Sequence, residues 1–536
     1  MLDKSNKKVM NVENRDATLL KLDRREFMKI TSAAALSTIA AGTLLGHFAQ
    51  AAVPKSGGKF TFALATGGSS DTLDPATFTS SQHIHIGYAI RNNLTEIGPD
   101  NKLKPELAEN WEASPDAKKW VFKIRKGVEF HNGKSLRAED VVATLNYHRN
   151  EESKSAAKSL LVSLTDVVAS DAHTVVVTLA NGSADFPYIL TDYHLGIMPS
   201  DGGGNVDVRG IGTGPYVIKE FIPGVSSNFI RFANYWKDGH GHFDEVELLI
   251  IADVTARQNA LISGKVDAID EVDLKTVGFL GKNPDLVVEE LASGFHANMP
   301  MFHDTAPFSN NHVRTALKYS IDREAILKVV LRGHGTLGND HPISPLMPFY
   351  DASIPQRAYD PEKAKWHLKQ AGMSQLDVSL SAADGVWAGA VDTAILFKEH
   401  ASKSGVNINV VREPNDDFWS DVWQKKPFVV SFWGARPTPD VIFSLAYAKD
   451  AAWNDMRFSH DKFNKLLVEA RAELDQAKRA ELYSEMQWII HDEGSTIVPF
   501  FKSHVFAHHK SIMNSGTMSG NWQLDGHKAM ERWWKA

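Results

Sequence analysis

Alternation of apolar and polar side chains predicts strands in the first half of the chain. Residues 57–64 alternate in this way, as a strand does when one of its faces is buried. The Asn132-Gly133 step is typical of a tight turn. Residues 138–147 have the apolar spacing of a helix. The segments that predict strands are residues 57–64, 120–125, 128–130, 164–169 and 174–179.

From about residue 310 the pattern changes to helices that alternate with strands. Residues 312–331 have helical spacing, with Asn310 or Asn311 as the cap. Residues 360–371 predict a second helix, and residues 461–493 predict two more. Strands are predicted between them at residues 377–382, 406–411 and 428–433. A β-rich first half and an alternating second half, without an internal repeat, predict two lobes of α/β character.

Composition narrows the class of protein. A chain of 536 residues is too long to fold around one ordinary hydrophobic core. A composition of 43% hydrophobic and 23% charged residues is typical of a globular protein. The chain has no cysteine, which excludes disulfides, cysteine-ligated zinc, iron–sulfur clusters, thiol nucleophiles and a lipid anchor on cysteine. The net charge of −7, without a basic tract beyond the first thirty residues, argues against nucleic acid as a partner.

The first residues have the pattern of an export signal. A charged segment at residues 21–29 precedes an uncharged, weakly hydrophobic segment at 30–48, and Ala49-Gln50-Ala51 is a small-x-small cleavage pattern. We therefore predict a signal peptide at residues 1–51, cut after Ala51. The alternative is an uncleaved anchor, which would normally be richer in Leu and Ile.

The charged segment contains Arg24 and Arg25, followed by Phe27 and Lys29. These residues resemble the twin-arginine consensus, although Asp23 and Met28 depart from it mildly. The resemblance implies a bacterial protein that crosses the inner membrane already folded.

Motifs of catalysis are missing from the sequence. There is no G-x-S-x-G nucleophile elbow and no H-E-x-x-H zinc helix. Residues 127–135 do not match the phosphate-binding loop motif, because five residues, not four, separate the two glycines. A hairpin turn is therefore the favoured interpretation of this segment. We therefore predict that the protein is not an enzyme and has no catalytic residue and no cofactor. The alternative from a different functional class is a secreted hydrolase or a metal-dependent enzyme.

Several motifs follow one another along the chain: LKPELAENWE at 103–112, WVFKIRKGVEFHNGKSLRAED at 120–140, GTGPY at 212–216, NYW at 234–236, VRTAL at 313–317 with IDR at 321–323, and YDPEKA at 359–364. In this order they resemble the motifs of the extracytoplasmic solute-binding proteins of peptide-type ABC importers (bacterial solute-binding protein family 5). The resemblance implies a two-lobed fold that closes at a hinge around its ligand. It also implies a periplasmic, monomeric receptor whose partners are an inner-membrane ABC permease and its ATPase subunits.

By analogy with this family we predict the boundaries of the domains. The first lobe comprises residues 52–95, 212–297 and 502–536, with an extra subdomain at 96–211. The second lobe comprises residues 298–501.

The ligand is predicted to be a peptide or an amino-acid-like compound. In peptide-binding relatives, an Asp in a W-x-[AG]-D segment holds the terminal amine of the ligand. Here Arg436 stands at that position, after Trp433. A buried guanidinium binds a carboxylate or phosphate, so we expect an acidic or strongly hydrogen-bonding group on the ligand. Asp440 has two alternatives: contact with an amine, or an internal ion pair with Arg436.

Aromatic side chains are the second element of the predicted site. Trp387, Trp433 and Arg436 are the best candidates for ligand contact, since planar side chains stack on ligands with little loss of entropy. Trp419 is a further candidate, although its spacing from Trp423, one helical turn away, favours packing in the core.

Histidine pairs are the candidates for metal binding. His83 and His85, like His240 and His242, have an x-spacing that can chelate a metal. Solvated loop histidines are the favoured interpretation, because cysteine and a nearby acidic cluster are missing; His83 and His85 are also candidates for ligand contact. The remaining alternatives for the ligand are an opine or sugar derivative, and nickel or haem, for which receptors exist in this family.

Overall fold

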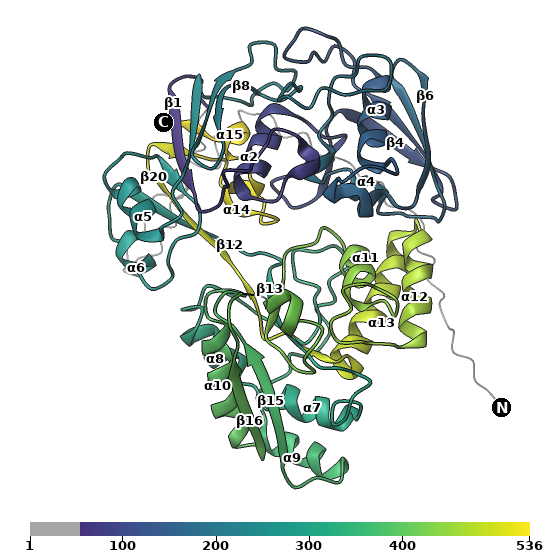
Figure 1. Ribbon diagram of the computed structural model, residues 1–536, viewed down its shortest axis with the longest axis vertical. Coiled ribbons are helices and arrows are strands. Elements are labelled where there is room, and N and C mark those ends of the chain that lie inside the picture. The colour runs from purple at the N-terminus through teal and green to yellow at the C-terminus, as the bar shows by residue number, and fades with distance from the viewer. Residues whose placement is uncertain (1–53, 417) are drawn as a thin grey trace, which may run out of the picture. The chain divides into compact units, whose positions relative to one another are not determined.

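The computed structural model describes residues 54–416 and 418–536, so the predicted signal peptide at residues 1–51 lies outside the described part. Strand β1 (Lys59–Leu64) runs inside a seven-stranded sheet of order β12-β20-β11-β1-β10-β9-β8, parallel to β10 and β11. Phe60, Phe62 and Leu64 are fully buried in its core. Figure 1 shows β1 in purple and β20 in yellow, so distant parts of the sequence share this sheet.

We call the part built on this sheet and on the four-stranded sheet described next the first lobe. Helices α2 and α15 contribute side chains to the same core as β1. Its other elements are η1 (Pro75–Thr77), α2 (Ser81–Ile90), β2 (Thr95–Ile97), β3 (Leu103–Pro105), β8 (Tyr216–Ile222), β9 (Ser226–Arg231), β10 (Glu245–Ile250), α5 (Val254–Ile262), β11 (Ala268–Ile269), α6 (Val277–Leu280), β12 (Leu286–Leu291), β20 (His504–His509), β21 (Ile512–Met513), α14 (Gln523–Gly526), α15 (Ala529–Arg532) and β22 (Trp534–Lys535).

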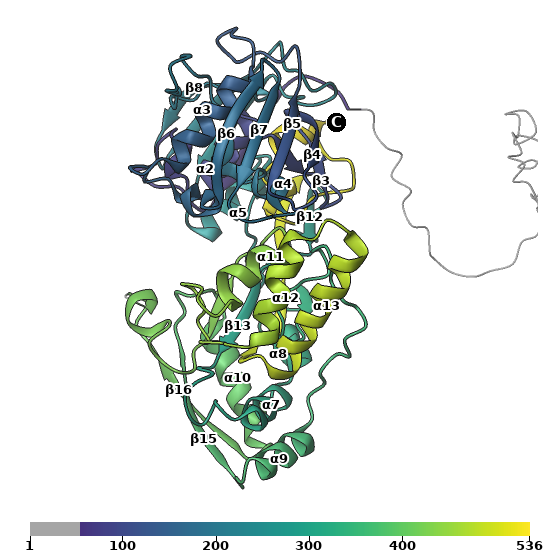
Figure 2. The same cartoon turned by 90° about the vertical axis from the view of Figure 1, so that its right-hand side faces the viewer.

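A four-stranded antiparallel sheet of order β4-β5-β7-β6 forms a separate layer of the first lobe, with helix α3 packed on β6 (Figure 2). Trp120 and Phe122 are buried in its own core. The strand predicted at residues 128–130 is wrong: Glu129 forms only an isolated bridge to Ser135, and no described strand pairs with these residues to extend that bridge into a ladder. The elements are β4 (Ala108–Ala113), β5 (Lys119–Ile124), α3 (Ala138–Arg149), η2 (Ala156–Leu161), β6 (Leu164–Asp171), β7 (Thr174–Leu179), α4 (Phe186–Ile189) and η3 (Tyr193–Leu195).

The second lobe is built on the sheet β14-β19-β13-β17, with β18 paired to β13, and on the parallel pair β15-β16. The chain passes from β12 to β13 and returns from β19 to β20. The predicted lobe boundaries, between residues 297 and 298 and between residues 501 and 502, stay predictions. The elements are β13 (His296–Pro300), α7 (Asn311–Tyr319), α8 (Arg323–Val329), β14 (Gly335–Leu337), α9 (Pro361–Gln370), β15 (Leu376–Ala382), α10 (Ala390–Ser402), β16 (Val406–Arg412), η4 (Phe418–Val422), β17 (Ser431–Trp433), α11 (Pro439–Ile442), η5 (Phe443–Tyr447), α12 (Asp461–Ala472), α13 (Gln476–Glu493), β18 (Thr496–Ile497) and β19 (Phe500–Lys502).

The long helix predicted at residues 312–331 is two helices, α7 and α8. Asn310 caps α7 as expected, but Asp322 accepts a hydrogen bond from the amide of Ala325 and begins α8. The Ser320 hydroxyl bonds back to the Ala316 carbonyl. Short polar side chains that bond to the backbone compete with a continuous helix, and here they end one and start the next.

Candidate functional site

Three of the family-like motifs meet at the side chain of Asn92, which lies just after α2. The Trp236 indole N–H and the Thr213 hydroxyl donate to Asn92 Oδ1 at 3.0 and 3.1 Å. The Asn92 amide donates to Glu106 Oε1 at 2.9 Å. These motifs therefore build the frame of the first lobe.

The glycines of the GTGPY motif allow the chain to lie against the end of α2. A Cβ on Gly212 would stand 2.0 Å from the Ile90 carbonyl oxygen, and one on Gly214 would stand 2.4 Å from the Ala89 carbonyl oxygen. Both distances are far inside van der Waals contact, so only glycine fits at these positions.

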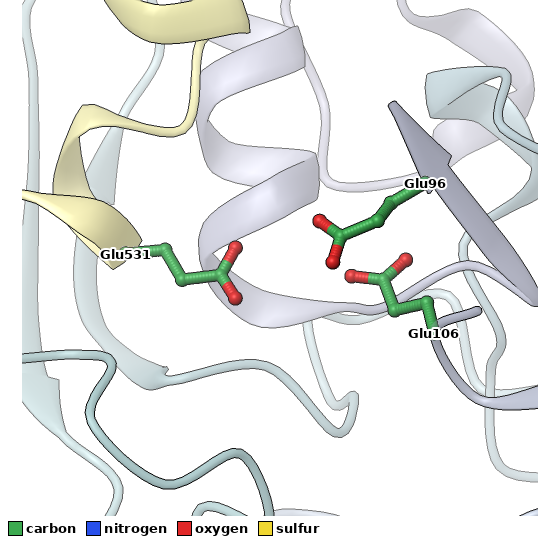
Figure 3. A group of neighbouring side chains, drawn as sticks. All are labelled: Glu96, Glu106 and Glu531. Atoms are coloured by element: carbon green, nitrogen blue, oxygen red, sulfur yellow. The ribbon is translucent and has the colours of Figure 1, made fainter. Parts of the chain in front are cut away.

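Glu96, Glu106 and Glu531 form a buried group of three carboxylates with ligand atoms within 4.8 Å of one another (Figure 3). Lys528 Nζ lies 2.6 Å from Glu96 and 2.9 Å from Glu106. Lys237 Nζ lies 2.5 Å from Glu96 and 2.9 Å from Glu531. Burial raises the pKa of Glu96, but Lys528 and Lys237 outweigh burial and bring it down to about 2. The group is an ion-pair cluster neutralised by its own cations, and it fits no metal without displacing them.

Strand β17 carries the predicted ligand residues at the edge of its sheet, where it pairs with β13 alone among the described strands. Trp433 is only 4% exposed. The Arg436 guanidinium lies 5.8 Å from the centre of the Trp433 ring, and its Nη1 donates to the carbonyls of Gly434 and Ala435 at 3.2 and 2.9 Å. The turn after β17 thus folds the arginine back over the indole.

Arg436 is a partly buried cation that forms no ion pair within the described part of the chain. Burial lowers its pKa, and two side chains of the first lobe oppose this effect: the Tyr193 phenol, which is neutral near pH 7 because burial raises its own pKa, and the Asp192 carboxylate. Sequence reasoning missed these two residues, because no motif marks the segment around η3. A cation without a carboxylate partner in low dielectric attracts an anion.

The alternative of an ion pair between Asp440 and Arg436 is wrong. Asp440 Oδ1 lies 3.0 Å from Nε of Arg471 on α12 and accepts a hydrogen bond from the Ser444 hydroxyl at 3.2 Å. Burial raises the pKa of Asp440, and Arg471 opposes that rise. Asp440 is therefore engaged inside the second lobe, which leaves Arg436 available.

Trp387 and Trp419 differ sharply in burial. Trp387 is 7% exposed, belongs to the core of the second lobe and meets Phe500 edge-on at 5.5 Å between ring centres. Trp419 is 46% exposed, although the sequence favoured core packing, and lies 5.8 Å from Phe432 on β17. Trp453, 45% exposed, lies 6.0 Å from Trp433. Half-exposed indoles thus flank β17, and ligand contact by these side chains stays a prediction.

His83 and His85 are buried on α2, so the favoured interpretation of solvated loop histidines is wrong for this pair. Positions i and i+2 of a helix point to different faces, which separates the two rings. The backbone amides of Thr72 and Thr79 approach the His83 ring nitrogens at 3.3 and 3.1 Å. His85 contacts the Ser81 carbonyl and His527. Both rings are occupied by contacts inside the first lobe, and ligand contact by them stays a prediction.

Replacing His85 is expected to change the pH dependence of stability. Burial lowers its pKa to about 4, and its bond to the Ser81 carbonyl opposes this only partly. Between about pH 6.5 and 4 the unfolded chain binds a proton here and the folded chain does not, so His85 costs up to about 3 kcal/mol of stability on acidification. The free energy of unfolding of His85→Gln, relative to that of the wild type, should therefore rise by about this amount as the pH falls from 7 to 4. Urea denaturation at a series of pH values measures it.

The matched control is His240→Gln, at a partly exposed loop position. Its stability relative to the wild type should stay constant over the same range of pH. A His85→Gln difference that is equally flat would contradict the assignment of a neutral, buried imidazole.

The comparisons with known proteins identify the class of this two-lobed receptor. Residues 102–455 match the model of the middle region of the bacterial extracellular solute-binding proteins, family 5, and the chain belongs to that family. It is a substrate-binding protein of an ABC importer, as the sequence predicted.

Two curated relatives illustrate the range of the family. The chain is 27% identical over 453 residues to heme-binding protein A of Haemophilus influenzae, covering 78% of this chain and 81% of the relative. It is 26% identical over 507 residues to di/tripeptide-binding protein 1 of Pseudomonas aeruginosa, covering 87% and 93%.

The two-lobed fold is confirmed by solved structures. The periplasmic binding protein AgaA of A. tumefaciens R10, in complex with agropinic acid, matches with a TM-score of 0.72 and 25% identity over 89% of this chain and 99% of that chain.

No helix in residues 54–416 and 418–536 is long and apolar enough to cross a membrane.

Proposed function

We propose that this receptor captures a peptide or amino-acid-like solute through an acidic group of that solute, which Arg436 binds at the edge of β17. It would act in the periplasm as a monomer, without cofactor or catalysis, and deliver the solute to its ABC permease by closing at the hinge. The names of the relatives, which include di/tripeptide-binding and glutathione-binding proteins and a complex with agropinic acid, are compatible with an acidic solute.

The observation that carries the proposal is the electrostatic state of Arg436. The guanidinium is partly removed from water and, among the described residues, is hydrogen-bonded only to neutral carbonyls of its own turn. Asp440, which could have neutralised it, pairs with Arg471 instead. A ligand carboxylate would supply the missing charge and two parallel hydrogen bonds.

The test begins with the mature chain from residue 52. Mass spectrometry of the native protein identifies any solute that is carried through purification. A thermal-shift screen then compares di- and tripeptides, opines and acidic sugar derivatives with their amides at equal concentration. We expect the carboxylate to raise the melting temperature and the amide to have little effect, because stabilisation grows with ligand concentration over Kd. Equal shifts for both forms, or a response only to nickel or haem, would refute the proposal.

A further inference from the structure

A turn with left-handed backbone angles lies at residues 524–527, close to the C-terminus. Leu524, Asp525, Gly526 and His527 have φ of 49°, 60°, 67° and 61°. Only glycine adopts this region freely, and a run of three other residues within four positions is a strained conformation. Strain of this kind persists where the surroundings enforce it, and it is concentrated at ligand-binding and other functional sites.

The surroundings enforce this turn from three sides. Asp525 Oδ1 accepts hydrogen bonds from the Ser519 amide at 2.8 Å and from Arg532 at 3.0 Å. His527 lies 3.3 Å from His85 between ring nitrogens, and Leu524 is fully buried in the core of the first lobe. The next residue, Lys528, is fixed by the carboxylates of Figure 3.

What this turn positions is the side chain of Trp522. Its ring stacks on His527 at 5.7 Å with an interplanar angle of 23°, and meets Tyr193 edge-on at 6.3 Å. Trp522 and Tyr193 both keep part of their surface exposed. The His527 ring beneath the indole is kept neutral, because burial lowers its pKa well below the usual value.

Tyr193 connects this aromatic pair with Arg436 of the second lobe. The phenol and the guanidinium lie close enough for each to influence the pKa of the other. The phenol of the first lobe therefore lies near the cation that we assign to the ligand carboxylate, and the Trp522 indole lies against that phenol. The backbone packing agrees, since a Cβ on Gly520 would stand 2.1 Å from the Ala292 carbonyl oxygen and one on Gly294 would stand 3.1 Å from the Cβ of Ala435, next to Arg436. Trp433 lies under the same cation in the second lobe.

We propose that Trp522 and Tyr193 determine specificity, and that they select acidic solutes whose carboxylate is joined to a planar aromatic group. This inference rests on the proposed role of Arg436. The carboxylate binds Arg436, while the ring of the solute stacks on the exposed part of the Trp522–Tyr193 pair. Aromatic pairs in stacked or edge-on geometry gain affinity beyond the area that they bury, whereas a saturated ring of the same size gains only the buried area.

The test uses matched pairs of probes on the mature protein, in calorimetric titrations. The pairs are 3-phenylpropionate with 3-cyclohexylpropionate, and Ala-Phe with Ala-cyclohexylalanine. We expect the wild type to bind the aromatic member about fivefold to tenfold more tightly in each pair. Trp522→Ala should abolish this preference and Trp522→Phe should retain most of it. Trp366→Ala, on an exposed tryptophan of α9, is the control and should bind as the wild type does.

The outcomes separate this inference from the proposed function. Binding of both members through Arg436 with equal affinity, or a preference that survives Trp522→Ala, overturns the specificity role and leaves the role of Arg436 intact. Binding that is insensitive to Arg436→Ala, or no binding of any carboxylate, overturns the proposed function and this inference with it. Circular dichroism of Trp522→Ala should match the wild type; if that variant unfolds, the comparison is made with Trp522→Phe and Tyr193→Leu.

Discussion

Arg436→Ala is expected to weaken binding of the native solute about 100-fold or more, without loss of the fold. Truncating one partner of a buried, hydrogen-bonded charge pair costs about 2–5 kcal/mol, much of it from leaving the other charge without a partner. The free protein should tolerate the change, because the guanidinium bonds only to two carbonyls of its own turn and to no carboxylate of the described chain. The measurement is Kd by calorimetry, with the melting temperature of the unliganded protein beside it.

Two further variants sharpen this experiment. Arg436→Lys keeps the charge but loses the planar fork, so it should recover only part of the affinity. Arg412→Ala removes an exposed arginine that pairs with Asp384, and it should leave affinity unchanged. Undiminished ligand-induced stabilisation in Arg436→Ala would show that this side chain does not contact the solute.

Lys528→Met is expected to be the most destabilising of the substitutions considered. The ammonium is buried between Glu96 and Glu106, and the variant leaves these carboxylates short of a positive charge. Breaking a buried ion pair by removing one partner costs about 3–5 kcal/mol, since the remaining charge is uncompensated. Burial raises the pKa of Glu106, and Lys528 and Lys237 oppose this rise only in part. Because the variant removes Lys528, it should raise the pKa of Glu106 further. Urea denaturation at pH 7 measures the loss.

The control for this variant is Lys510→Met. Lys510 lies 2.5 Å from Asp285, and both side chains are 57% exposed. Exposed pairs contribute about 0–1 kcal/mol, so the control should stay near the wild type. A loss for Lys528→Met no larger than that of the control would mean that the cluster of Figure 3 contributes little to stability.

Local patterns predicted most of the regular elements, and they failed where a single polar residue or a short turn decided the outcome. Strand β1 and helix α3 follow directly from apolar spacing. The break between α7 and α8 depends on Asp322, whose capping geometry competes with a helical pattern that looks continuous. The strand expected at 428–433 shortens to β17, because only residues 431–433 find a partner in β13.

The candidate site was predictable in part. Arg436 and Trp433 could be found from the sequence, because a family-like segment presents an arginine where a carboxylate is expected. The burial of Trp387 and the exposure of Trp419 could not be predicted in this way, because burial depends on packing against segments that are distant in the sequence, and the spacing of Trp419 and Trp423 favoured the core. The engagement of Asp440 by Arg471 was equally hidden, because the two residues are joined by no motif.

The sequence by itself determined the family and the two-lobed frame, and it pointed to the arginine that we propose as the positive charge of the site. The tertiary structure alone decided the state of that charge: which groups surround Arg436, that Asp440 is paired with Arg471, and that Trp522 lies against Tyr193 just before a left-handed turn. The reason is physical. Backbone periodicity and capping depend on neighbours along the chain, whereas burial, charge pairing and aromatic contact depend on distances of a few ångströms between segments that the sequence keeps far apart.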